Sequence, residues 1–128
     1  MRLLLDTQLA LWWQFAPERV STAVRQRVMR ADSTVFISEA SLWEMAIKQS
    51  LGKLQLDLPL FYDQCVADGF TWLAISAQHM MGVATMAYPS AHRDPFDRLL
   101  VMQSRAEPLI LLTADRALAV YGETVHVV

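Results

Sequence analysis

The feature that most constrains the fold of this 128-residue chain is a set of four short, nearly uninterrupted apolar runs. They span residues 3–5, 34–37, 109–112 and 125–128. A strand with one face in water alternates apolar and polar residues, whereas a strand of a parallel sheet is covered on both faces and is apolar throughout. We therefore predict that these runs are strands of a parallel sheet, and that residues 72–75 could add a fifth.

Helical patterns lie between the predicted strands. Val20, Val24 and Val28 recur at four-residue spacing, as residues on one face of a helix do. Residues 76–87 open with Ser76, a residue type that favours the N-cap of a helix. Helices in these segments would cover the faces of the sheet.

Glycine and proline indicate where helices end. Gly52 and Gly69 each follow a helical stretch, at the position where a left-handed C-terminal cap favours glycine, and residues 88–95 predict a loop. The sequence has no internal repeat, low-complexity tract or linker-like change in composition. The alternation of strands and helices therefore predicts one α/β domain over residues 1–128, with a short parallel sheet of four to five strands flanked by helices.

The composition is that of a well-packed globular protein, with 54% hydrophobic and 19% charged residues. Cys65 cannot close an intramolecular disulfide, and Asp6 comes too early for a signal-peptide apolar region. No uncharged apolar run approaches the roughly 18–20 residues that span a bilayer, so we expect a cytoplasmic protein with no membrane insertion. The formal net charge of -2 argues against a broad basic surface for nucleic acid.

Acidic residues follow the predicted strands at their carboxyl ends. Asp6 directly follows the first strand, and Asp115 comes three residues after the strand at 109–112. The carboxyl ends of parallel strands lie along one edge of the sheet, and ligands bind in the crevice outside that edge. Glu44 and Asp97 lie in the first turns of helices predicted to begin there. We therefore expect these four carboxylates to face one cleft.

Carboxylates that converge in one cleft repel one another and need a neutralising partner. Mg2+ or Mn2+ suits such a site, because these cations take oxygen ligands and leave coordination positions for water and phosphate oxygens. Zinc would favour clustered cysteine and histidine, whereas Cys65, His79, His92 and His126 show no ligand spacing. The residues therefore favour magnesium-type chemistry.

Four blocks of sequence together resemble the PIN-domain toxins of bacterial VapBC modules. The blocks are LLLDT (residues 3–7), SEASLWEMAIK (38–48), HRDPFDRLL (92–100) and LTADR (112–116). They stand in the family's order and spacing, and the resemblance covers essentially the whole chain. It implies a PIN-like three-layer sandwich and a metal-dependent endoribonuclease, the toxin of a type II toxin–antitoxin module.

The resemblance also implies roles for individual residues. The acidic quartet around one or two Mg2+ or Mn2+ ions would be Asp6, Glu44, Asp97 and Asp115. Auxiliary positions would be Asp94, Thr113 and Thr7, and Thr113 could orient a ligand carboxylate or a metal-bound water. Candidate phosphate contacts are Arg93, Arg98, Arg116 and Lys48. Gln8 departs from the family, because many members with this opening have histidine there.

Two kinds of macromolecule are implied as partners. The substrate would be single-stranded or loop RNA, and a small antitoxin would cover the cleft with its tail. A toxin homodimer is the expected assembly. The apolar segment 9–13 could contribute to an antitoxin groove or a dimer contact, although core packing is the commoner use of such residues.

Each acidic residue also has a simpler structural explanation. Ser41 and Glu44 match a capping box, Asp94 before a proline is a good N-cap, and aspartates after strands often cap the next helix. We take capping as the primary role of Asp94. The tryptophans and methionines are expected to pack in the core or at an interface, and His92 to be an exposed loop residue.

Two other classes of function compete with the nuclease. A phosphoaspartyl phosphatase or receiver domain also has an aspartate after its first strand beside Mg2+. The phosphatase pattern requires a second aspartate two residues later, where this chain has Gln8. A non-catalytic PIN-fold binding module is the second alternative, and the intact acidic set argues against it.

Overall fold

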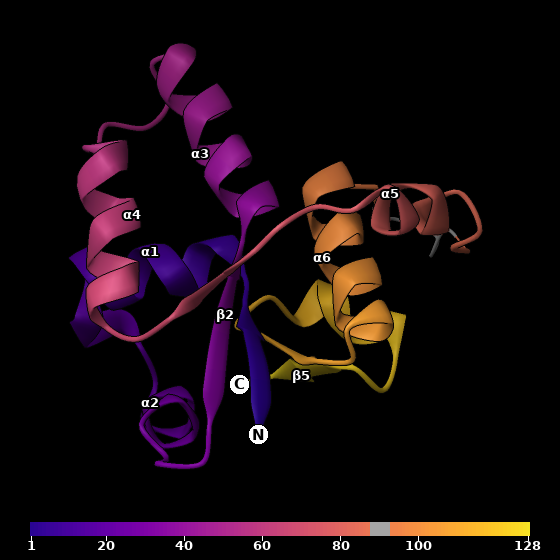
Figure 1. Ribbon diagram of the computed structural model, residues 1–128, viewed down its shortest axis with the longest axis horizontal. Helices are drawn as coiled ribbons and strands as arrows, with labels where there is room; N and C mark the ends of the chain where they lie inside the picture. The colour runs from indigo at the N-terminus through magenta and orange to yellow at the C-terminus, as the bar shows by residue number, and fades with distance from the viewer. Residues whose placement is uncertain (88–92) are drawn as a thin grey trace.

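The computed structural model describes residues 1–87 and 93–128 and contains a five-stranded parallel sheet (Figure 1). In space the strands follow the order β3-β2-β1-β4-β5, and each neighbouring pair is parallel. Their bounds are Arg2–Leu5 (β1), Thr34–Ser38 (β2), Thr71–Leu73 (β3), Ile110–Thr113 (β4) and Val125–Val127 (β5). The predicted parallel sheet is confirmed, including the fifth strand, although the strand ends differ by one or two residues from the prediction.

Helices cover both faces of the sheet and complete the predicted three-layer α/β arrangement (Figure 1). Their bounds are Thr7–Phe15 (α1), Thr22–Val28 (α2), Glu39–Ser50 (α3), Leu58–Ala67 (α4), Ala77–Val83 (α5) and Pro95–Ala106 (α6), with 3-10 turns at Pro17–Arg19 (η1) and Arg116–Tyr121 (η2).

Strand β1 is apolar throughout because its three leucines pack against core on both faces of the sheet. Leu3 and Leu5 belong to one core cluster, together with residues of α1, α2 and α4. Leu4 points to the opposite face and belongs to a second cluster, together with residues of α6 and η2. Side chains alternate between the faces of a strand, and here both faces are covered, so all three leucines are fully buried.

The ends of the helices agree in part with the sequence. Gly52 and Gly69 have φ angles of 72° and 82°, so the left-handed conformation predicted for both is confirmed. Ser76 is the N-cap of α5, as predicted, but this helix ends at Val83 and not near residue 87. The chain leaves the helix in turns there, with the Met86 N–H donating to the Val83 carbonyl at 3.2 Å.

Two helix starts differ from the prediction. Helix α3 begins at Glu39 with Ser38 as its N-cap, so the alternative explanation of Ser41 and Glu44 as a capping box does not hold. The last residue of β2 serves as the cap, because the helix follows the strand with no loop between them. Val20 precedes α2 and belongs to the turn after η1, although it is buried like Val24 and Val28.

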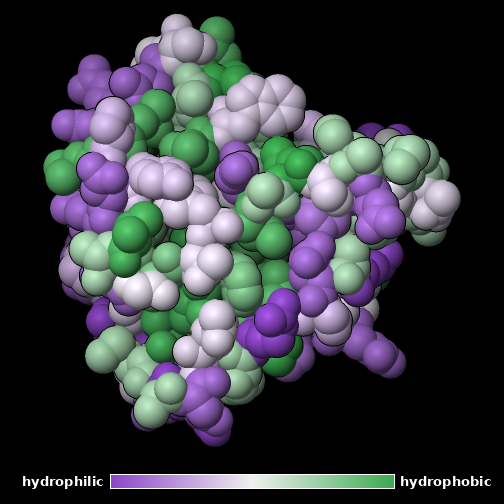
Figure 2. All heavy atoms as spheres, viewed as in Figure 1, coloured by the Kyte–Doolittle hydropathy of each residue, from purple (hydrophilic) through white to green (hydrophobic). Residues whose placement is uncertain are grey.

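Residues 88–92 of the loop predicted for residues 88–95, and with them His92, predicted to be exposed, lie outside the described part of the chain. Residues 93 and 94 belong to neither a helix nor a strand. Pro95 already belongs to α6. Within residues 1–87 and 93–128, no helix combines the length and apolar character needed to cross a bilayer. On the face shown in Figure 2, hydrophobic and hydrophilic residues are intermingled.

The strand order places a topological switch point beside β1. From β1 the chain forms β2 and β3 on one side, and then crosses to form β4 and β5 on the other. In open parallel sheets, ligands bind outside the carboxyl ends of the strands where the order reverses in this way. Asp6 follows β1 at that point, and the structure has a cleft there.

Candidate functional site

A cleft of about 610 Å3 opens at the carboxyl ends of β1 and β4. The two strands are joined here by the Asp6 N–H, which donates to the Leu112 carbonyl at 3.1 Å. All four predicted quartet residues line the cleft, together with the auxiliary residues Asp94 and Thr7. Its acidic lining residues are Asp6, Glu44, Asp94, Asp97 and Asp115. The fold thus brings carboxylates from four distant chain segments to one place.

Asp6 is the most buried of these carboxylates, with 6% of its surface exposed. It is the N-cap of α1, where its Oδ1 accepts from the Leu9 N–H at 2.8 Å. Burial raises the pKa of Asp6, and the hydrogen bonds from Thr113 and Leu9 only partly offset that effect. The negative charges of Asp115 and Glu44 raise the pKa further. A nearby cation would favour the ionised form.

Thr113 connects two of the acidic residues. Its hydroxyl donates to Asp6 Oδ2 at 2.5 Å and accepts from the Asp115 N–H at 3.0 Å. The side chain is fully buried at the end of β4. Asp115 then caps η2, since its Oδ1 accepts from the Ala117 N–H at 3.0 Å. Thr113 therefore fixes the direction of Asp6 and the backbone that carries Asp115.

Glu44 lies in the second turn of α3 and is held from two sides. The Thr7 hydroxyl lies 2.8 Å from Glu44 Oε1 and 2.8 Å from Ser41 Oγ. On the other oxygen, Lys48 Nζ lies 2.8 Å from Glu44 Oε2. The hydrogen bond to Glu44 raises the pKa of Lys48. The sequence analysis considered Ser41 only as a helix cap and not as part of the site, although its spacing of three residues from Glu44 puts both on one face of the helix.

The last two acidic residues lie at the start of α6. Asp94 is its N-cap, and its Oδ1 accepts from the Phe96 N–H at 2.9 Å and the Asp97 N–H at 3.0 Å. The capping role predicted for Asp94 is therefore confirmed. Asp97 lies in the first turn of the same helix and is partly buried.

The donor set fits a hard divalent cation, because the cleft offers carboxylate and hydroxyl oxygens. Within residues 1–87 and 93–128, however, no three acidic, histidine or cysteine side chains lie close enough together to hold one ion. Each carboxylate instead has its own partner, such as Thr113 for Asp6 and Lys48 for Glu44. A cation held by three of these carboxylates would need their side chains to turn toward one another.

Comparison with known proteins identifies the family. A family model described as the PIN domain matches residues 3–123. The chain is also 30% identical over 124 residues to "Ribonuclease VapC22" of Mycobacterium tuberculosis, an alignment that covers 90% of this chain and 88% of that protein. This chain belongs to the VapC family of PIN-domain proteins. The resemblance inferred from the four sequence blocks is thereby confirmed.

Solved structures show the same fold. A crystal structure of VapBC2 from Rickettsia felis, bound to a DNA fragment from their promoter, contains a chain that matches with a TM-score of 0.68 and 15% identity, over 99% of this chain and 97% of that chain. A domain of a functionally unknown protein from Methanocaldococcus jannaschii matches with a TM-score of 0.60 and 15% identity, over 99% and 90% of the two chains. The PIN-like fold predicted from the sequence is confirmed.

The basic residues predicted as phosphate contacts in this VapC-family chain have different environments. Lys48 lines the cleft together with Lys53. Arg93 and Arg116 are exposed beside the lining residues Asp94 and Asp115.

For Arg98, the prediction of a phosphate contact is wrong. It is 2% exposed, and its guanidinium donates to the Met86 and Ala87 carbonyls and to the Tyr121 hydroxyl at 3.1–3.3 Å. A side chain that is enclosed in this way cannot reach substrate phosphate. Nothing in the sequence indicates this burial, because Arg98 is adjacent to Asp97 and looks like part of the same polar block.

Proposed function

We propose that this chain is a metal-dependent endoribonuclease, the toxin of a type II toxin–antitoxin module, acting in the cytoplasm as a single PIN domain over residues 1–128. One observation carries the proposal: Asp6, Glu44, Asp97 and Asp115, which are remote in sequence, line a single cleft at the switch point of the sheet. The 30% identity to "Ribonuclease VapC22" supports RNA as the substrate.

Asp6 and Asp97, with help from Glu44 and Asp115, would hold the metal, for which we propose Mg2+ or Mn2+. When bound, such an ion lowers the pKa of a water ligand and neutralises charge on phosphate oxygens. The Thr113 hydroxyl would hold the Asp6 carboxylate in one orientation for the metal, and the Thr7 hydroxyl would do the same for Glu44. Lys48 balances the charge of Glu44 and would be available to a substrate phosphate if a metal ion took over that role.

The substrate we propose is single-stranded or loop RNA, gripped at its phosphates near the cleft. Lys48 and Lys53 supply positive charge inside the cleft, and Arg93 and Arg116 are exposed residues next in sequence to its lining residues Asp94 and Asp115. A formal net charge of -2 gives no broad basic surface, so these few cations would position the RNA locally. Neutral substitution of Lys53 or Arg116 should weaken RNA binding without unfolding the protein.

An antitoxin partner and a toxin homodimer complete the proposal. The matched VapBC2 structure is itself a complex of the two proteins. A second groove of about 370 Å3 shares Gln8, Leu11, Trp12 and Leu54 with the acidic cleft and continues along α1 to Phe15. Its apolar side chains suit a hydrophobic antitoxin segment whose tail would reach the carboxylates.

The direct test is cleavage of total RNA by the purified protein with Mg2+, with Mn2+ and with EDTA, followed by mapping of the new RNA ends. Cleavage should require the divalent cation and should be lost in Asp97→Asn. Asp57→Asn is a matched control, because Asp57 is an exposed N-cap of α4 outside the cleft and asparagine caps equally well. Metal-independent cleavage, or equal activity in the two variants, would contradict the proposal.

A further inference from the structure

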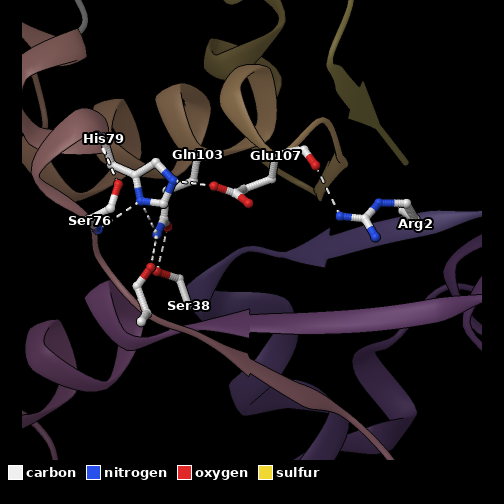
Figure 3. Close-up of polar contacts among 7 residues, drawn as sticks. Arg2, Ser38, Ser76, His79, Gln103 and Glu107 are labelled. Atoms are coloured by element: carbon white, nitrogen blue, oxygen red, sulfur yellow. Dashed lines mark hydrogen bonds and ion pairs between the residues drawn. The ribbon is translucent and has the colours of Figure 1, made fainter.

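A buried polar cluster joins α3, α5 and α6 outside the acidic cleft (Figure 3). Ser38, at the N-cap of α3, donates its hydroxyl hydrogen to Gln103 Oε1 at 2.5 Å. Both residues are fully buried, and His79 beside them is 2% exposed. Burying polar groups costs free energy unless they are hydrogen-bonded, so a cluster of this kind holds one specific arrangement of the helices. We call the hydrogen bond between these two side chains the Ser38–Gln103 clasp.

The rest of the cluster fixes which way the Gln103 amide points. Gln103 Nε2 donates to the Ala74 carbonyl at 3.3 Å and lies 3.4 Å from His79 Nδ1. His79 Nδ1 also accepts from the Ser76 N–H at 3.0 Å, while His79 Nε2 lies 2.5 Å from Glu107 Oε2. An imidazole that accepts at Nδ1 carries its proton on Nε2 and donates it to the Glu107 carboxylate. The amide nitrogen therefore faces Ala74 and His79, which leaves Oε1 facing Ser38.

Two contacts show that α3 and α6 run antiparallel where they pack. The clasp joins the beginning of α3 to the end of α6, and Trp43 on α3 contacts Phe96 on α6 with ring centroids 5.3 Å apart. Glu44 is six residues beyond Ser38, and Asp97 is six residues before Gln103. At about 1.5 Å of rise per residue, Glu44 and Asp97 therefore each lie about 9 Å from the clasp along their helix axes, in the same direction.

The two contacts differ in how well they define position. An aromatic contact such as Trp43–Phe96 tolerates sliding, because apolar attraction is not directional. A hydrogen bond depends steeply on distance and angle. A shift of α3 by one residue along α6 would move Ser38 by about 1.5 Å and break the clasp. Of these two contacts between α3 and α6, the clasp is therefore the one that restricts sliding of the helices along each other.

We propose that Gln103 is a positioning residue: its hydrogen bond to Ser38 sets the register of α3 against α6 and thereby the separation of Glu44 from Asp97 in the acidic cleft. This inference rests on the proposed function, since it concerns the metal site of that nuclease. Gln103 itself does not line the cleft and acts through the two helices that carry the acidic residues.

Gln103→Met tests the clasp, because methionine matches glutamine in length and shape but cannot bond to Ser38. We expect Mn2+ affinity, measured by electron paramagnetic resonance, to fall about 10-fold, and kcat for RNA cleavage to fall while KM stays within twofold. Ser104→Ala is the control. Ser104 is the next residue of α6 and equally buried, but its hydroxyl bonds to Val101 and Thr124, away from α3. This variant should lose stability without losing Mn2+ affinity.

Ser38→Ala removes the other partner of the clasp and should lower Mn2+ affinity in the same way. It is the test if Gln103→Met does not fold. Ser38 also caps α3 through the Ala40 N–H, so the double variant separates the two roles. If both residues act on the metal site through their shared hydrogen bond, adding Gln103→Met to Ser38→Ala should lower Mn2+ affinity no further. Equal Mn2+ affinity in wild type and Gln103→Met, or equal losses in Gln103→Met and Ser104→Ala, would overturn the inference. A wild-type protein that neither binds Mn2+ nor cleaves RNA would instead overturn the proposed function.

Discussion

Folding and the proposed metal binding favour different protonation states of Asp6. Burial raises the pKa of this carboxyl, so the folded state binds its proton more tightly than the unfolded state does. The stability that this group contributes is therefore fully present below its unfolded pKa and is lost as the pH rises through its folded pKa. Without a nearby cation, ionisation of Asp6 therefore destabilises the fold.

Asp6→Asn should therefore stabilise the metal-free protein at pH 7 and abolish RNA cleavage. We expect the free energy of unfolding in EDTA to rise by about 1 kcal/mol, since asparagine removes the buried charge but still accepts from the Leu9 N–H. Urea unfolding at pH 7 and at pH 4 measures the effect. The advantage of the variant should shrink at the lower pH, and a variant less stable than wild type at pH 7 would contradict this reading.

Thr113→Val should weaken metal binding although the substituted residue is not a ligand. Valine matches threonine in shape but loses the hydrogen bonds to Asp6 Oδ2 and from the Asp115 N–H. We expect an approximately 10-fold lower Mn2+ affinity and a loss of stability of about 1–2 kcal/mol. Thr113→Ser restores the hydroxyl and should recover most of the affinity. Equal Mn2+ affinity in the valine and serine variants would show that the hydroxyl does not orient the carboxylate.

At the scale of whole elements, Arg98 joins three parts of the fold. From α6 it donates to the Met86 and Ala87 carbonyls after α5 and to the Tyr121 hydroxyl at the end of η2. Arg98→Met should lower the free energy of unfolding by about 3 kcal/mol, because it leaves buried acceptors without their donor. Arg116→Gln, on an exposed residue, should change stability by less than about 0.5 kcal/mol. Urea unfolding of both variants checks this, and equal stabilities would place the Arg98 side chain outside the core.

The strands could be predicted because burial on both faces leaves a direct trace in the sequence, as in the three leucines of β1. The acidic cleft could be predicted because strand ends and helix starts meet at one edge of a parallel sheet. No sequence pattern predicts the Ser38–Gln103 clasp. Its partners are 65 residues apart, and no periodicity connects them. Arg98 was misjudged for the same reason, since only the fold shows which arginines are enclosed.

At the scale of the whole molecule, the sheet order makes the site dependent on the complete fold. Asp6 and Asp115 follow neighbouring strands, β1 and β4, that are far apart in the sequence. Glu44 and Asp97 come from α3 and α6. The cleft therefore forms only when the long-range pairing of β1 with both β2 and β4 is complete. Ligand binding at this cleft is expected to stabilise the fold as a whole.

Mg2+ or Mn2+ should accordingly raise the melting temperature. A ligand that binds only the folded state at 100 times its Kd adds about 2.7 kcal/mol, which for a chain of this size corresponds to roughly 10 °C. Differential scanning fluorimetry of wild type in EDTA, in MgCl2 or MnCl2, and in NaCl of matched ionic strength separates specific binding from screening of the carboxylates. The shift should grow with the logarithm of the metal concentration and be much smaller in Asp97→Asn. A shift of the same size in NaCl, or in Asp97→Asn, would mean that the cations act by screening and that the four carboxylates do not form a metal site.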